Sequence, residues 1–306
     1  MSFADDTSLV ISDANVSTIF QRANVEMNNL FEWFCANGLS LNPNKTKFIV
    51  FKGGNKHVDF NNLSISINGT HLQQIGSQFQ EKTTKFLGVF MDESLSWTYH
   101  LTHVKNKISR ALYGIKQVKN FLPKDSLKTL YLSLIQPYIA YAILVWGNAN
   151  PSILQKTVSL QKRAIRIINN AGYNDHTDPL FKQCEIFKIG DMYQYQVCLF
   201  MDDFNKKKLP RSFDGMFRLN SDIQQNRMTR QSNDMNVPRC NSVFCSKLPL
   251  FNFPSIWNNW HRTLSTCKSR SQTKNILKMY ILNSYYSYVK CENPYCCQCT
   301  HVQANK

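Results

Sequence analysis

The feature that most constrains the fold of this chain is a change in the spacing of its apolar residues near Trp97. Before this residue, short alternating stretches and turn signals surround one long helical pattern. After it, apolar residues recur every three or four positions. Alternating patterns suit strands and the longer period suits helices. The sequence therefore predicts an α+β layer followed by a mainly helical region.

The region before Trp97 predicts one long helix and several strands. Residues 17–38 place apolar side chains on one helical face, and Gly38 is a typical C-terminal stop. Strands are expected at 47–51 and 85–91. Asn68-Gly69, between alternating apolar residues, is typical of a two-residue hairpin turn. We expect residues 1–92 to form an antiparallel sheet with this helix packed on it.

The region after Trp97 predicts three amphipathic helices with basic outer faces. The first has an apolar stripe from Leu101 to Leu122, the second begins after Pro123, and the third covers 152–170. The basic residues between the apolar ones are Lys105, Lys107, Arg110, Lys116 and Lys119 in the first helix, and Lys156, Lys162, Arg163 and Arg166 in the third. We expect these helices to form a small bundle over 93–172.

The charge of the chain favours a polyanionic partner. It has 36 Lys+Arg against 20 Asp+Glu, a formal net charge of +16. An excess of this size favours nucleic acid or an acidic membrane surface. The alternative is that these cations only solvate the outer faces of the helices.

The remaining patterns bear on the membrane, the compartment and the C-terminal region. Residues 129–147 are uncharged, but Gln136-Pro137 interrupts them, so we expect a buried helical hairpin and no membrane span. No signal peptide pattern is present, which predicts a nuclear or cytoplasmic protein with reduced thiols. Residues 173–306 are expected to be mainly helical with loops.

A cysteine-rich stretch lies near the C-terminus. Its candidate zinc ligands are Cys291, Cys296, Cys297, Cys299 and His301. Their spacing lacks the usual pair of two-residue-spaced cysteines of a zinc knuckle. We therefore favour a cluster of thiols over a Zn²⁺ site.

Two adjacent aspartates, Asp5 and Asp6, precede a run of strand-forming residues. Carboxylate oxygens are the ligands that Mg²⁺ prefers, and Mg²⁺ usually keeps waters or substrate phosphates in the rest of its shell. Pairs of such ions serve the two-metal mechanism of polymerases. The two aspartates are therefore a candidate metal site.

Three stretches follow one another in this order: "FADDTSLVIS", "LFEWFCANGLSLNPNKTKFIVF" and "KFLGVFMDESLSWTYHLTHVKNKISRALYGIKQV". Together they resemble the second half of a reverse transcriptase from a non-LTR retrotransposon of the jockey-like LINE kind. The similarity continues through "LIQPYIAYAILVWG" and "LQKRAIRIINNAGYNDHTDPLF". The resemblance implies a partial polymerase palm at 1–92, an α-helical thumb at 93–172 and a C-terminal region at 173–306. It also implies RNA-directed DNA synthesis by the complete enzyme.

The resemblance also implies roles for particular residues. Asp5 and Asp6 become catalytic Mg²⁺ ligands, Lys45 a candidate general acid, and Phe86, Leu87 and Gly88 part of the primer grip. The implied partners are an RNA template with a DNA primer, or an RNA–DNA duplex, and a dNTP in the complete enzyme. The residues expected to follow the nucleic-acid backbone are Lys105, Arg110, Lys116, Lys119, Lys162 and Arg163.

The chain departs from the family pattern at its start. The family requires a third carboxylate and the fingers upstream of the FADD motif, and this sequence begins at Met1. We therefore expect a fragment that lacks polymerase activity alone. The alternative is a non-catalytic nucleic-acid-binding remnant or a pseudogene product.

Overall fold

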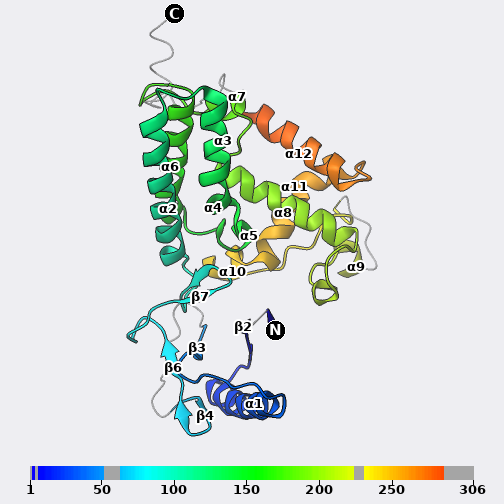
Figure 1. Ribbon diagram of the computed structural model, residues 1–306. Coiled ribbons are helices and arrows are strands. Elements are labelled where there is room, and N and C mark those ends of the chain that lie inside the picture. The colour runs from blue at the N-terminus through cyan, green and yellow to red at the C-terminus, as the bar shows by residue number, and fades with distance from the viewer. Residues whose placement is uncertain (1, 4–5, 52–62, 224–230, 286–306) are drawn as a thin grey trace, which may run out of the picture. The chain divides into compact units, whose positions relative to one another are not determined.

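The computed structural model describes residues 2–3, 6–51, 63–223 and 231–285. These fall into two compact units, residues 1–99 and residues 100–306 (Figure 1). The first unit holds one long helix and short strands, and the second is built of helices. This mixture agrees with the expected α+β class.

The long helix of the first unit is α1 (Val16–Ala36). Its N-cap is Asn15, whose side chain accepts a hydrogen bond from the Ser17 amide. The chain leaves the helix through Gly38, at a φ of +69° that glycine adopts without strain. The helix predicted over 17–38 is thus confirmed.

The strands of the first unit pair two by two, which differs from the expected single antiparallel sheet. The pairs are β1 (Ser2–Phe3) with β2 (Asp6–Thr7), β3 (Lys47–Ile49) with β6 (Gln73–Ile75), β4 (Ser66–Ile67) with β5 (Thr70–His71), and β7 (Thr84–Phe86) with β8 (Val89–Met91). The β3–β6 pair is parallel. A parallel pair needs a long crossover connection, and the segment between these two strands provides it.

Tight turns join β4 to β5 and β7 to β8 in the first unit. Asn68 and Gly69 have φ values of 46° and 76°, which confirms the hairpin predicted from their sequence. Leu87 and Gly88 have φ values of 43° and 82°. The single strand predicted over 85–91 is therefore wrong, because the chain reverses between β7 and β8.

The core of the first unit lies between α1 and the β4–β5 hairpin. Asn24 of α1 donates to the Ser64 carbonyl and accepts from the Ser66 amide, both at 2.9 Å. These bonds fix the hairpin against the helix. The buried residues of this core are Phe20, Ala23, Met27, Ile65, Ile67 and Leu72.

The second unit consists mainly of helices. They are α2 (Thr98–Val118, which begins two residues earlier), α3 (Lys124–Leu134), α4 (Gln136–Ala140), α5 (Ile143–Trp146), α6 (Pro151–Ile168), α7 (Asp178–Gln183), α8 (Ile189–Asn205), α9 (Asn220–Ile223), α10 (Val243–Lys247), α11 (Pro249–Leu264) and α12 (Arg270–Ser284), with a short 3₁₀ helix at Arg211–Phe213. Helix α8 packs against α5, α11 and α12 (Figure 1). Helix α8 is therefore the central helix of this group.

Helices α2, α3 and α6 confirm the three amphipathic helices expected from the sequence. The predicted start after Pro123 is also confirmed, because Pro123 is the N-cap of α3. One detail differs. Leu122, expected on the apolar stripe of α2, lies beyond the end of that helix and is exposed.

The uncharged stretch 129–147 covers the end of α3 and the short helices α4 and α5. The helical course breaks at Ile135 and again at Ala142, where φ is 52°. Trp146 is buried, and its indole donates to the Tyr141 carbonyl at 2.8 Å. Across the described part of the chain, no helix has the length and apolarity needed to cross a membrane.

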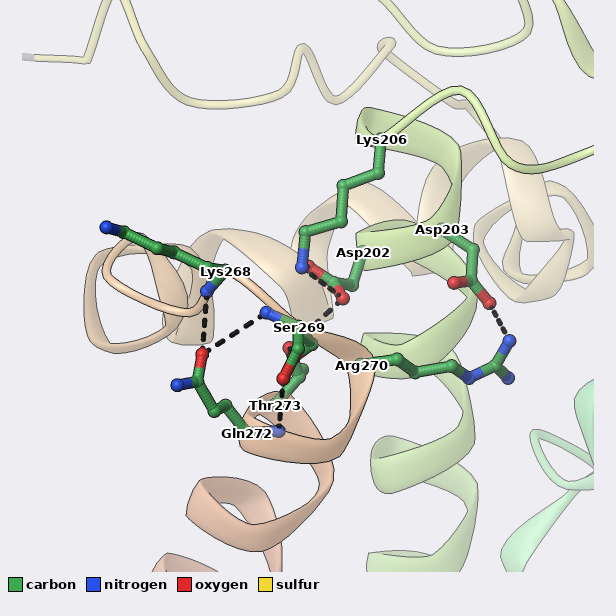
Figure 2. Close-up of polar contacts among 8 residues, drawn as sticks. All are labelled: Asp202, Asp203, Lys206, Lys268, Ser269, Arg270, Gln272 and Thr273. Atoms are coloured by element: carbon green, nitrogen blue, oxygen red, sulfur yellow. Dashed lines mark hydrogen bonds and ion pairs between the residues drawn. The ribbon is translucent and has the colours of Figure 1, made fainter.

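Polar contacts join the C-terminal end of α8 to the N-terminal end of α12 (Figure 2). Asp202 accepts hydrogen bonds from Lys206 at 2.8 Å and from the Thr273 hydroxyl at 3.1 Å. Asp203 forms an ion pair with Arg270 at 2.5 Å. Both aspartates are buried, so these partners are needed to stabilise their carboxylates.

Candidate nucleic-acid interface

The FADD motif falls at the first strand pair. Phe3 pairs with Asp6 across β1 and β2, while Asp5 lies outside the described residues. Two adjacent carboxylates supply the hard oxygen ligands that suit Mg²⁺. Among the residues that the structure describes, no group of three or more His, Cys, Asp or Glu side chains could hold a metal ion. The cysteine-rich stretch 291–301 lies outside the described residues as well.

Lys45 is exposed in the turn that precedes β3. Its amide donates to the Asn42 carbonyl at 3.2 Å, so its backbone position is fixed by the turn. An exposed ammonium group on a fixed turn can reach an anionic ligand. A solvated lysine would have the same local structure.

Phe86, Leu87 and Gly88 lie at the β7–β8 turn. Phe86 pairs with Val89 and is half-buried, while Leu87 and Gly88 are exposed. The positive φ values of Leu87 and Gly88 make this turn tight. The three residues therefore form one compact projection of the first unit.

Asp92 fixes the exit of this hairpin, a role that sequence reasoning missed. Its buried carboxylate accepts hydrogen bonds from the Ser94 hydroxyl at 2.6 Å and the Ser96 hydroxyl at 2.9 Å. Burial alone would raise the pKa of Asp92, but these hydroxyls and the amides of the same serines outweigh burial and lower it. The Asp-x-Ser-x-Ser spacing is the sequence signal for this arrangement.

The candidate contact residues of α2 do not share one face. Leu101, Ile108 and Ile115 are buried along the inner side of the helix. Lys105 and Lys116 are separated by about three helical turns and lie on one flank of that side. Arg110 is exposed on the opposite side. Because of this split, Arg110 does not share a helix face with Lys105 and Lys116.

The cations of α6 do share one face. Lys156, Lys162, Arg163 and Arg166 lie on the side opposite the buried residues Gln161, Ala164, Ile165 and Ile168. We call these four cations the α6 basic face. Helix α6 contains no acidic residue. Lys162 and Arg163, which the sequence predicts as contact residues, are therefore joined on this face by Lys156 and Arg166.

Gln161 fixes the orientation of α6 from its buried side. Its amide nitrogen donates to the Tyr131 hydroxyl and to the Phe187 carbonyl, each at 2.9 Å. Its amide oxygen accepts from the Ile189 backbone amide at 3.1 Å. One side chain thus connects α3, α6 and the start of α8. This arrangement keeps the α6 basic face turned away from the core.

The basic helices belong to a stretch that is almost free of acidic residues. Residues 94–174 contain eleven lysines and arginines and a single acidic residue, Asp125. One of these cations, Lys119, lies in the turn after α2. Such a density of positive charge attracts polyanions. Contacts between these cations and phosphates would not distinguish one base sequence from another.

Curated proteins similar to this chain are polymerases of mobile elements. The RNA-directed DNA polymerase from mobile element jockey of Drosophila melanogaster is 22% identical over 208 residues, which is 67% of this chain and 22% of that protein. The jockey polymerase of Drosophila funebris is 23% identical, over 62% of this chain and 20% of that protein. No protein-family model matches the chain, and no solved structure matches it.

A relative from another element gives the same result. The Pol polyprotein from type-1 retrotransposable element R1 of Nasonia vitripennis is 25% identical, over 54% of this chain and 49% of that protein. The chain spans about a fifth of the length of the jockey polymerases. The resemblance found in the sequence is confirmed: this chain is similar, over up to two thirds of its length, to RNA-directed DNA polymerases of jockey and other non-LTR retrotransposons.

Proposed function

We propose that this chain is a part of a reverse transcriptase that binds an RNA–DNA duplex through the basic helices of its second unit. The support is the similarity to polymerases of non-LTR elements and the charge of residues 94–174. In this proposal residues 1–92 correspond to the palm, 93–172 to the thumb and 173–306 to a C-terminal region.

The observation that carries the proposal is the α6 basic face. Four cations lie on one side of a helix without acidic residues, opposite a side that Gln161 holds in the core. Each phosphate that a cation neutralises releases counterions and favours binding. Such contacts position a duplex and carry no sequence information, as a polymerase that copies any template requires.

In this proposal the first unit would supply the metal ligands, a general acid and the contacts to the primer end. In the complete enzyme Asp5 and Asp6 would hold Mg²⁺, which supplies Lewis-acid stabilisation of the reacting phosphate oxygens. We further propose Lys45 as a general acid near the incoming nucleotide. The projection formed by Phe86, Leu87 and Gly88 would contact the 3′ end of the primer.

The experiment is a binding titration of the full chain with a fluorescently labelled RNA–DNA duplex. The double substitution Lys156→Gln with Arg163→Gln removes two cations from the α6 basic face. We expect affinity at about 0.1 M salt to fall roughly tenfold for each lost phosphate contact. Both residues are exposed, so the helix itself should remain folded.

The matched control removes the same charge from α12. Lys274→Gln with Lys278→Gln alters two exposed lysines, one of which pairs with Glu185 at 2.6 Å. This control should leave the affinity within about twofold, because both lysines lie on α12, outside the α6 basic face, and Lys278 is already paired with a carboxylate. Equal losses for the two pairs would show that net charge alone drives binding, and would contradict the proposal.

A further inference from the structure

The turn between α2 and α3 exposes an aromatic ring. Phe121 is 84% exposed, although phenylalanine is among the residues most often buried in proteins. Tyr113, near the end of α2, is 67% exposed. Neither ring contributes to the core of the second unit. Their exposure therefore has no explanation in the packing of the fold.

The backbone around Phe121 is held in one conformation. Its amide donates to the Val118 carbonyl at 3.0 Å, and the Leu122 amide donates to the same carbonyl at 3.2 Å. Pro123, the N-cap of α3, follows with φ and ψ of −68° and 160°. Two helices thus present the ring at the end of a short, hydrogen-bonded turn. The backbone of this turn therefore loses little conformational entropy when Phe121 binds a ligand.

Lysines surround this turn in the sequence. Lys116 and Lys119 precede Phe121, and Lys124 follows it, with Asp125 as the single acidic residue nearby. Within the described part of the chain none of the three lysines forms an ion pair. An exposed ring among unpaired cations combines a surface for stacking with charges for phosphates.

We propose that Phe121 is a stacking platform for an unpaired base of a nucleic-acid strand, with Lys119 and Lys124 contacting the adjacent phosphates. The partner is single-stranded RNA or DNA, because the bases of an intact duplex already stack on one another and offer no face to a protruding ring. In the duplex-binding function proposed above, on which this inference rests, that strand is the single-stranded extension beyond the duplex. Tyr113 of α2, which precedes Phe121 in the chain, offers a second exposed ring.

The test compares two labelled RNA–DNA duplexes bound by the full chain, one blunt and one with a short single-stranded extension that carries 2-aminopurine. The measured quantity is the gain in affinity that the extension provides. Phe121→Ala removes the stacking contact to one base and should therefore reduce this gain about fivefold or more. Phe121→Trp should keep the gain and quench the 2-aminopurine fluorescence on binding.

A matched control removes a ring that lies among acidic residues. Trp33 is exposed on α1 near Glu26 and Glu32, so Trp33→Ala should leave the gain unchanged. The same variants are also titrated with vesicles that contain anionic lipid, since an aromatic ring beside lysines can also bind an acidic membrane surface.

Three outcomes would overturn the inference. They are an unchanged gain in Phe121→Ala, an equal loss of affinity for the blunt duplex, and a loss confined to the vesicles. Binding to the extension that depends on Phe121 while the blunt duplex does not bind would support the inference and contradict the proposed duplex function. The two proposals therefore fail separately.

Discussion

Replacing Gln161 by methionine should destabilise the second unit and test how α6 is positioned. The change keeps the length of the side chain but removes three hydrogen bonds, to the Tyr131 hydroxyl, the Phe187 carbonyl and the Ile189 amide. Gln161 and Tyr131 are fully buried. The Tyr131 hydroxyl and the Ile189 amide therefore lose a partner that water cannot replace.

The expected cost follows from these two buried groups. A buried polar group left without a partner costs about 1–3 kcal/mol, so the total for the two groups is about 2–6 kcal/mol. This is a large part of the free energy of unfolding of a typical domain, about 5–15 kcal/mol. With a urea m-value of roughly 2–3 kcal/mol/M, the unfolding midpoint should fall by about 1–3 M.

Equilibrium unfolding in urea, followed by circular dichroism of the helices, measures this effect. Tyr131→Phe is the matched partner in a double-mutant cycle, because it removes the hydroxyl that Gln161 contacts. The double variant should be about 1 kcal/mol more stable than the sum of the two single changes predicts. A midpoint shift for Gln161→Met that corresponds to less than about 1 kcal/mol would refute the reasoning.

Three further predictions concern the second unit. Gly147→Ala should destabilise by about 1–3 kcal/mol in urea unfolding, because its Cβ would lie 2.5 Å from both the Ile143 carbonyl oxygen and the Tyr193 ring; wild-type stability would exclude this packing. Burial, with a smaller contribution from His103, lowers the pKa of His100 from 6.5 to about 4. Stability contributed by neutral His100 should thus be present above pH 6.5 and lost as the pH falls toward 4, and His100→Phe should flatten the pH profile of Tm in that range. Arg270→Ala leaves the buried Asp203 carboxylate without its cation and should lower stability by about 1–3 kcal/mol, and adding Asp203→Asn should recover part of the loss.

Local sequence signals predicted the helices and one hairpin well. The stripe from Leu101 to Ile115 corresponds to the buried side of α2, and Pro123 marks the start of α3. Asn68-Gly69 forms the turn that its composition requires. In each case the residues that determine the helix or turn lie within it or a few positions away, so the local sequence is enough to predict it.

Features that depend on distant partners or unusual backbone conformations were missed. Leucine rarely adopts a positive φ, so the local pattern predicted a strand through Leu87, and only the resemblance to the primer-grip turn indicated a turn there. The parallel pairing of β3 with β6 joins segments far apart in the chain. The three-way contact of Gln161 likewise depends on Tyr131 and Ile189, which a helical pattern does not identify.

The sequence predicted which residues of the candidate site are basic better than it predicted which helix faces they share. The sequence identified Lys105, Arg110 and Lys116 as basic, but the geometry of α2 separates Arg110 from the other two. The cations of α6 were expected on an outer face, and the structure places them together there. Exposure of Phe121 could not be predicted, because the end of α2 at Val118 decides it.

The salt dependence of binding to an RNA–DNA duplex tests the central claim most directly. If the α6 basic face contacts the phosphate backbone, the logarithm of the affinity should fall linearly with the logarithm of salt concentration. The magnitude of its slope should decrease by roughly 1.8 in Lys156→Gln with Arg163→Gln, about 0.9 for each cation removed. The α12 control should keep the wild-type slope. A slope near zero, or one that this α6 double variant leaves unchanged, would contradict the account.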